Sequence, residues 1–309
     1  MPISEAVCPA GISSFFEICN TDANGRAFVD PERIGARGGG FAIQRGVRAQ
    51  VKVKKSTNTH INVVINGRLA PEAQTTKWAL ERLLEKARIA MNVEVSLKVS
   101  VPMGAGYGTS AAGTAASCLA LADATNISIT MNELGKLVHV AEVLNRTGLG
   151  TASALMIGGF VLVTEPGAPS VGVVDRLIFP RDHAIVCAYF APIPTRSSLE
   201  QHGIEARVNP PARLAMKTIM GNPCISTFLA EARKFSAQVG FLTDRVSQMM
   251  ETMLAAGANG VAQNMIGEAV HAVAEKVRIP RLIKAAKRAS PSATVFSTEL
   301  SIHGVRLVN

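Results

Sequence analysis

The sequence predicts an α+β fold made of two domains. Its 309 residues correspond to two domains or to one large one, at roughly 100–200 residues per domain. The first half carries short segments in which apolar and polar residues alternate, which is the pattern of half-buried strands, whereas the second half shifts toward amphipathic helices. We expect two closely packed α+β domains, residues 1–180 and 181–309, although no linker marks the boundary.

The composition is that of a globular protein with a basic surface. Apolar residues account for 48% of the chain and charged residues for 18%, which excludes intrinsic disorder. A formal net charge of +9 favours anionic ligands such as nucleotides, phosphorylated metabolites, nucleic acid or anionic lipid. Aromatic residues make up only 5%, too few for the stacking platforms of proteins that bind single-stranded nucleic acid.

No segment predicts export or membrane insertion. The first eleven residues lack the basic and apolar regions of a signal peptide. The most apolar stretch, 151–163, spans about 13 residues, whereas a membrane helix needs about 20. The five cysteines are widely spaced and include no CxxC pair, so neither a zinc site nor a redox motif is indicated. These features predict a cytoplasmic protein.

Alternation and helical periodicity give a coarse assignment of elements. In the first half we expect strands at 47–54, 60–65, 93–101 and 158–164, and helices at 75–91, 110–124 and 131–145. In the second half we expect strands at 183–190, 269–273, 293–297 and 304–308, and helices at 223–239, 243–256 and 280–289. The clearest strand is 93–101, where apolar residues alternate with polar ones until Pro102 ends the run.

A glycine-rich loop follows this strand and leads into a helix of small residues. Gly104, Gly106 and Gly108 stand at every second position, which lets the backbone bend and approach a ligand closely. The free N–H groups and the positive dipole end of the helix favour an anion, and Thr109 and Ser110 place hydroxyls there. These features predict a phosphate-binding loop, with a ligand-free glycine turn as the structural alternative.

Two common phosphate-binding loops are excluded. A Walker A motif requires a Lys directly after its last glycine, and none follows Gly108. The Rossmann fingerprint requires glycines at positions one, three and six, and the sixth position here is Thr109.

The loop instead resembles the ATP-binding motif of the GHMP kinases, a superfamily that phosphorylates small metabolites. The resemblance is carried by Pro-x-Gly-x-Gly-x-Gly-Thr-Ser-Ala-Ala at 102–112. Segments 8–17 and 263–270 are similar to the N-terminal and C-terminal motifs of that superfamily, in the same order. Segments 15–19, 35–40, 139–143 and 147–150 further resemble the archaeal pantoate kinases.

The resemblance implies a two-domain GHMP-type fold, an ATP-dependent kinase and a set of site residues. The reaction implied is phosphorylation of the hydroxyl of a small carboxylate, pantoate, to 4-phosphopantoate in coenzyme A synthesis. The catalytic residues implied are Ser110, Glu142 and His139, with Ser110 and Glu142 holding Mg²⁺ and Arg37, His139 and Arg196 holding the acceptor. The ATP-binding residues implied are Pro102, Gly104, Ala105, Gly106, Tyr107, Gly108, Thr109, Ser110 and Ala111. A guanidinium on a glycine-rich loop, as at Arg37, suits a carboxylate.

The sequence departs from the pantoate kinase pattern at four positions. The family places an Asp directly after Thr-Gly-Leu-Gly, where this chain has Thr151, which cannot act as a carboxylate base. A family Ser, His and basic residue are replaced by Ala36, Gly11 and Val163. Two interpretations stay open. Phosphoryl transfer can proceed without a side-chain base, because its loose transition state demands little of one; or the chain is a paralogue with another acceptor or little kinase activity.

A weaker alternative is nucleic-acid binding by a basic helix near the C-terminal end. Six cations fall within 13 residues: Lys276, Arg278, Arg281, Lys284, Lys287 and Arg288. No nucleic-acid-binding motif accompanies them, so a solvated amphipathic helix is the simpler interpretation and nucleic acid is not an expected partner. The oligomeric state is left open, with a homodimer as the candidate.

Overall fold

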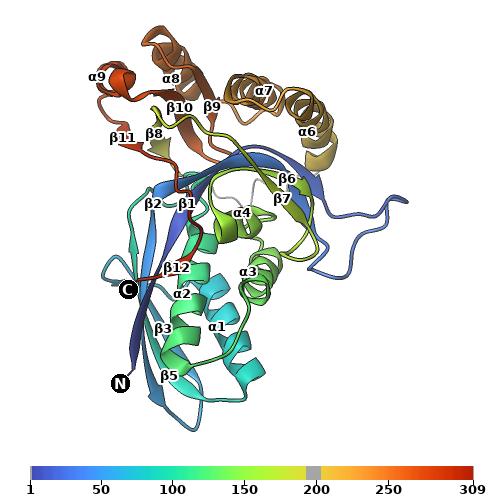
Figure 1. Cartoon of the computed structure of the whole chain (residues 1–309), viewed down its shortest axis with the longest axis vertical. Helices are drawn as coiled ribbons and strands as arrows, with labels where there is room; N and C mark the ends of the chain where they lie inside the picture. The colour runs from blue at the N-terminus through green and yellow to red at the C-terminus, as the bar shows by residue number, and fades with distance from the viewer. Residues whose placement is uncertain (1, 193–202, 309) are drawn as a thin grey trace.

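The computed structural model describes residues 2–192 and 203–308, which form two β-sheets flanked by helices (Figure 1). Within these residues the larger sheet has eight strands in the order β12-β1-β2-β5-β3-β4, with β6 paired to β2 and β7 paired to β6. Its strands are β1 (Ile3–Cys19), β2 (Gly35–Lys55), β3 (His60–Ile65), β4 (Arg68–Leu69), β5 (Met91–Val99), β6 (Phe160–Glu165), β7 (Val173–Leu177) and β12 (Arg306–Leu307).

The lower half of the large sheet has one buried face and one exposed face. In β5, Val93, Val95 and Leu97 are buried and the residues between them are exposed, as the alternating pattern predicts. The helices on the buried face are α1 (Gln74–Ala87), α2 (Thr109–Thr125) and α3 (Met131–Asn145), followed by the short α4 (Thr151–Ile157) (Figure 1). Small residues make α2 narrow enough to lie against both the sheet and its neighbouring helices.

The upper half of the same sheet is buried on both faces. The alternation in β1 ends at Cys8, and most residues from there to Ile18 are buried. β1 pairs with β2 from Ile3↔Lys52 to Cys19↔Gly35. A cluster of phenylalanines fills one side of this region, with the Phe41 and Phe160 rings stacked at 4.6 Å. The second sheet packs here, which explains the loss of the polar face.

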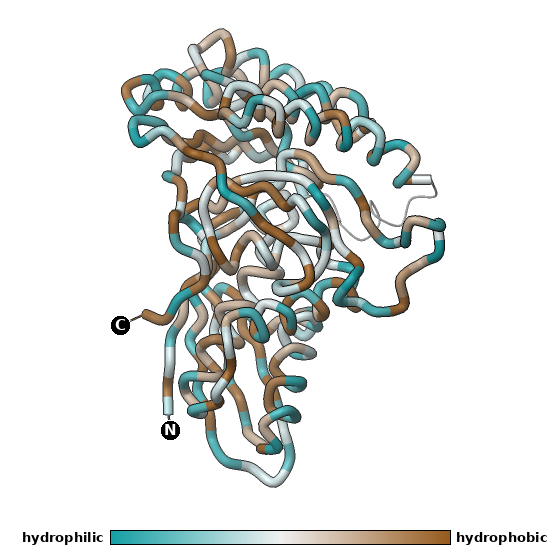
Figure 2. The backbone as a smooth tube through the Cα atoms, turned by 45° about the vertical axis from the view of Figure 1, so that its right-hand side comes forward, coloured by the Kyte–Doolittle hydropathy of each residue, from teal (hydrophilic) through white to brown (hydrophobic). Residues whose placement is uncertain are grey.

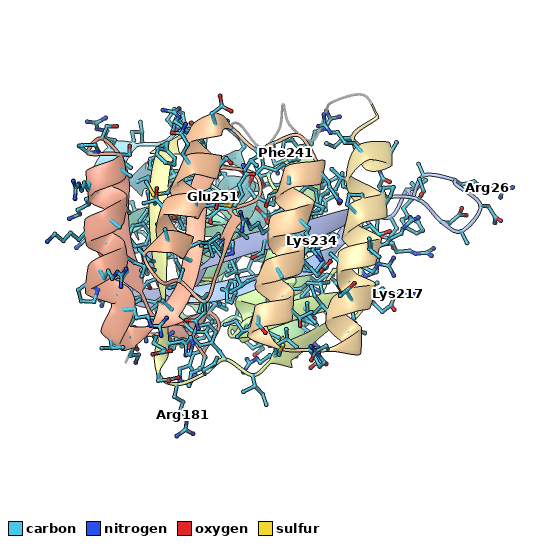
Figure 3. All side chains as sticks on the ribbon, turned by 90° about the horizontal axis from the view of Figure 1, so that it is seen from above. Arg26, Arg181, Lys217, Lys234, Phe241 and Glu251 are labelled. Atoms are coloured by element: carbon cyan, nitrogen blue, oxygen red, sulfur yellow. The ribbon has the colours of Figure 1, made fainter. Side chains whose placement is uncertain are left out.

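The second sheet has the order β11-β8-β10-β9 among the described residues. Its strands are β8 (His183–Ala191), β9 (Gly260–Gln263), β10 (Glu268–Glu275) and β11 (Thr294–Thr298), and its helices are α6 (Ile204–Gly221), α7 (Ile225–Gln238), α8 (Asp244–Ala255) and α9 (Ile279–Ala289), with a 3₁₀ turn at Lys276–Arg278. Side chains of α8 and α9 pack on one face of the sheet, and α6 and α7 share the core on the other face. Figure 3 shows the four helices side by side, with α6 next to the loop that carries Arg26.

Hydrophobic segments concentrate where the two sheets meet, and the outer helices alternate between hydrophobic and hydrophilic residues (Figure 2). Among the residues that the structure describes, no helix combines the length and apolar character needed to cross a membrane.

The last residues return to the large sheet. Ser301 N donates to Ala42 O at 2.8 Å, Gly159 N donates to Ser301 O at 2.7 Å, and Val305 N donates to Leu155 O at 3.0 Å. β12 then pairs with β1. The two sheets therefore separate in sequence between β7 and β8, but the chain crosses back before it ends.

The α+β fold class is confirmed, and most of the predicted elements lie within two residues of the observed ones. The helix at 131–145 and the strand at 60–65 match α3 and β3, whereas the predicted helix 75–91 ends four residues early, at Ala87. Strands β1, β4, β7 and β9 and helices α4 and α6 were not predicted from the sequence. Pro9 lies in β1 beside a register shift, and Pro210 and Pro211 lie inside α6, so these two elements contain residues that normally argue against them.

A buried polar chain links the two sheets beneath the phenylalanine cluster. Ser14 Oγ of β1 lies 2.9 Å from His271 Nε2 of β10, and His271 Nδ1 lies 2.9 Å from Asn264 Oδ1. An amide oxygen can only accept, so Nδ1 carries the proton and Nε2 accepts from the hydroxyl of Ser14. Burial lowers the pKa of His271 to about 3, so the imidazole is neutral in the folded protein.

We predict that His271 makes the protein less stable in mild acid. The unfolded chain binds a proton on this side chain below about pH 6.5, whereas the folded protein does so only near pH 3, so the free energy of unfolding falls as the pH falls through this window. At pH 5 the loss from this one group is about 2 kcal/mol. Urea unfolding at pH 7.5 and pH 5 should show a smaller pH-dependent loss for His271→Gln than for the wild type. His303→Gln, which removes an exposed histidine, is the control, and equal losses in all three proteins would contradict the assignment.

Candidate active site

A cavity of about 790 Å³ lies beside the upper half of the large sheet. Its lining comes from segments far apart in the sequence, within 11–16, 36–42, 72–75, 104–110, 145–155, 161–163 and 265–266. All three motifs singled out in the sequence therefore contribute to one cavity.

The glycine-rich loop forms one wall of this cavity. Gly104, Gly106 and Gly108 have φ values of +71°, +72° and +58°, a backbone region that side-chain-bearing residues rarely adopt. Helix α2 begins directly afterwards, and its N-cap Gly108 supplies no side-chain hydrogen bond to the first turn. The cavity lining from this region consists of Gly104, Gly106, Tyr107, Gly108, Thr109 and Ser110. The wall therefore presents a glycine-rich backbone and the hydroxyl-bearing residues Thr109 and Ser110 at a helix N-terminus.

The N-terminal and C-terminal motifs hold this loop from both sides. Gly11 N donates to Tyr107 O at 3.0 Å, and Met265 N donates to Ser13 O at 2.8 Å. Gly267 packs so closely on the loop that a Cβ there would lie 2.4 Å from the carbonyl carbon of Ala105. The three motifs are thus in direct backbone contact.

Glu142 is a buried carboxylate beside the loop. Its Oε1 accepts a hydrogen bond from Thr147 Oγ1 at 3.2 Å, and its side chain is also bonded to Ser110. Thr147 is in turn 3.2 Å from Thr75 Oγ1 at the start of α1. Burial raises the pKa of Glu142 to about 7, and the bonds from Thr147 and Ser110 oppose that rise. No cation pairs with Glu142 within residues 2–192 and 203–308.

Gly148 is fixed by the same carboxylate. A Cβ at this position would lie 2.5 Å from Glu142 Oε2, so any side chain would displace the acid. The absence of a side chain at Gly148 therefore leaves the space that the Glu142 carboxylate occupies.

Thr151 is the first residue of α4 and lines the cavity. Its methyl carbon lies close to both Gly11 and Gly108, 3.2 Å and 2.5 Å from where their Cβ atoms would be. A side chain at 151 therefore stands between the N-terminal motif and the last glycine of the loop, beside Ser110. Val163 and Ala36, two other departures from the family pattern, also line the cavity.

Arg37 lies across from Glu17 in the pairing of β1 with β2, and it lines the cavity with about a third of its side chain exposed. Its Nε and Nη2 lie 2.8 Å and 2.6 Å from Glu17 Oε2. The guanidinium is therefore already oriented by a buried carboxylate, a partner that the sequence did not predict.

His139 does not reach the cavity, although it lies one turn from Glu142. It is 1% exposed, and its Nε2 lies 2.8 Å from the carbonyl oxygen of Ile34, which accepts a hydrogen bond. Burial lowers the pKa of His139. The side chain anchors the segment that leads into β2, and its predicted contact with an acceptor stays a prediction.

Three other predicted residues do not line the cavity as described. Ala105 and Ala111 are fully buried, and Pro102 lies before the lining residues, so these three support the wall without forming it. Arg196 lies outside the described residues. The structure adds Thr75, Thr147 and Glu17, for which the sequence predicted no role, although Glu17 and Thr147 lie within the segments 8–17 and 147–150.

The donor set fits a nucleotide with a hard cation. The loop offers backbone N–H groups at a helix N-terminus, which suits phosphate oxygens. Ser110 and Glu142 offer the oxygen ligands that Mg²⁺ prefers, and no cation of the described residues pairs with the buried acid. In the part of the chain that the structure describes, no cluster of three or more His, Cys, Asp or Glu could hold a metal by itself.

Comparisons with known proteins agree with this geometry. Residues 41–169 match the diphosphomevalonate decarboxylase-like N-terminal domain. The chain is 27% identical to a pantoate kinase of Thermococcus kodakarensis over 87% of this chain and 86% of that protein. It is 28% identical to a pantoate kinase of Methanospirillum hungatei, covering 79% and 78% of the two chains.

A solved structure described as a phosphotransferase related to the CoA biosynthesis pathway superposes on 99% of this chain and 98% of its own, with a TM-score of 0.87 and 23% identity. That likeness establishes the fold. The sequence similarity to the pantoate kinases also runs along most of the chain. The chain is therefore an ATP-dependent small-molecule kinase that is similar to the pantoate kinases over most of its length.

Proposed function

We propose that this protein phosphorylates the hydroxyl of pantoate with ATP, giving 4-phosphopantoate for coenzyme A synthesis. The observation that carries the proposal is the extent of the similarity to pantoate kinases, which covers 87% of the chain. Nucleic-acid binding is not favoured by any of the relatives.

The glycine-rich loop would hold the phosphates of ATP, and Ser110 with Glu142 would hold Mg²⁺. The bound cation would neutralise charge that develops on the phosphates. Ser110 is fixed at the start of α2 and Glu142 is held by Thr147, so both ligands are placed before the substrates arrive. Such placement lowers the barrier because little reorganisation is needed during the reaction.

Arg37 would bind the carboxylate of the acceptor. The acceptor side of the cavity otherwise offers apolar groups, including Phe15, Ala154, Leu155 and Val163. Arg146 also lines the cavity, and an oriented guanidinium such as that of Arg37 beside apolar side chains suits a small, branched hydroxy acid.

We further propose that transfer proceeds without a carboxylate base at position 151. Thr151 cannot accept the hydroxyl proton at neutral pH, and a loose phosphoryl-transfer transition state can be reached before that proton leaves. The proton can pass to the phosphate or to water as the new bond forms.

We predict that Ser110→Ala and Glu142→Gln each lower kcat/KM for pantoate phosphorylation by about 100-fold or more, because each removes a ligand of the cation. A coupled assay for ADP over a range of pantoate and MgATP concentrations would measure the effect. Glu85→Gln changes an exposed carboxylate on α1 outside the cavity and serves as the control. Turnover within threefold of the wild type in both site variants, with folded proteins, would contradict the site assignment.

We predict that Thr151→Asp does not raise turnover above that of the wild type. The added carboxylate would lie at a helix N-terminus, where it is tolerated, but it would repel the phosphates of ATP. Thr151→Asn is the matched control because it has nearly the same shape without the charge. Steady-state rates with pantoate and ATP test this prediction. A tenfold gain for the Asp variant over both the wild type and the Asn variant would show that a base is needed.

A further inference from the structure

Helix α6 is fastened to the end of β1 through residues spaced four apart. Positions at this spacing lie on one face of a helix. Asn209 bonds both backbone groups of Ile18, accepting from its N–H at 2.8 Å and donating to its carbonyl at 2.9 Å. One turn earlier, Glu205 Oε1 accepts from Asn20 Nδ2 at 3.1 Å. This face of α6 therefore follows the end of β1 in a fixed register.

Arg213 is the next residue of this face, and it binds Glu17. Its Nε lies 2.6 Å from Glu17 Oε1, while Arg37 occupies Oε2. The Glu17 side chain is 4% exposed, so its charge is compensated by these two guanidinium groups and little by water. One arginine faces the cavity and the other lies on the outer surface of α6, with 63% of its side chain exposed.

The charges around Arg37 depend on this outer arginine. Glu17 neutralises Arg37, and Glu165 at the exposed end of β6 acts on it as well. The formal charges of four side chains then sum to zero, those of Arg37, Arg213, Glu17 and Glu165. Without Arg213 the formal charges of the other three sum to −1. An incoming carboxylate would then meet a net negative group, even though Arg37 itself stays in place.

We propose that Arg213 is a positioning residue for acceptor specificity: by binding the second oxygen of Glu17, it leaves the guanidinium of Arg37 available to the acceptor carboxylate. This inference rests on the proposed function, because it needs a carboxylate acceptor at Arg37. Glu17 transmits the effect, since it is the group that both arginines contact. The surface of α6 thereby takes part in substrate selection without touching the substrate.

Arg213→Met tests the proposal, because it keeps the side-chain stem and removes the charge. KM for pantoate should rise about three- to tenfold, with kcat within twofold and KM for ATP unchanged. Arg213→Lys should restore most of the affinity. In a Glu17→Gln background, Arg213→Met should change KM for pantoate by less than twofold, because the transmitting charge is gone.

Lys217→Met is the matched control. It removes a positive charge from the same helix one turn further on, where no contact with Glu17 occurs (Figure 3 labels Lys217). Thermal unfolding should show that all variants fold. An equal rise in KM for Lys217→Met, or an unchanged KM for Arg213→Met, would overturn the proposal.

Direct binding separates this proposal from the proposed function. Calorimetric titration with pantoate in the presence of a non-hydrolysable ATP analogue should show weaker binding to Arg213→Met than to the wild type. If the wild type binds pantoate but does not phosphorylate it, the assignment of pantoate as the kinase substrate is wrong. The difference in pantoate binding between the wild type and Arg213→Met then still tests the role of Arg213. Wild-type protein that neither binds nor phosphorylates pantoate would overturn both.

Discussion

The site depends on close backbone contact between three segments that are far apart in the sequence. The Gly267 backbone lies against Ala105, and the N-terminal motif bonds both to the glycine-rich loop and to Met265. Contacts of this kind leave no room for side chains, so the loop cannot be repositioned without moving β1 and the second sheet together. The buried chain from Ser14 through His271 to Asn264 joins the same segments one layer deeper. The geometry of the cavity is thus a property of the junction between the sheets.

These fixed contacts explain how the carboxylate of Glu142 can stay buried although no cation of the described residues pairs with it. Glu142 is surrounded by hydroxyl groups and by the backbone at Gly148, and its own charge is disfavoured by burial. Such an arrangement is costly in the free protein and would become favourable if the proposed cation and phosphates bound beside it. The buried carboxylate would thereby favour the binding of a charged ligand at this position.

Much of this could be predicted from the sequence, because local patterns carried it. The alternation at 93–101, the small-residue helix after the glycines and the position of Glu142 on α3 all follow from spacing along a single element. The contacts of Glu17 with Arg37 and Arg213, and the distance of His139 from the cavity, depend on how separate elements pack, and no local pattern encodes that. Helix α6 was missed because Pro210 and Pro211 contradict its helical pattern, although its position beside β1 makes it the source of the residues that fix Glu17.

The return of the chain to the large sheet has a consequence for folding. Residues 299–308 form hydrogen bonds to β2, Gly159, α4 and β1, so the first sheet is completed only after these residues have been made. Contacts between such distant parts of a sequence form slowly, because a large loop must close before they gain any stability. During synthesis the free edge of β1 would stay open until then, a point at which another chain could pair. We therefore expect the two halves of this protein to fold as one cooperative unit, after residues 299–308 have been synthesised.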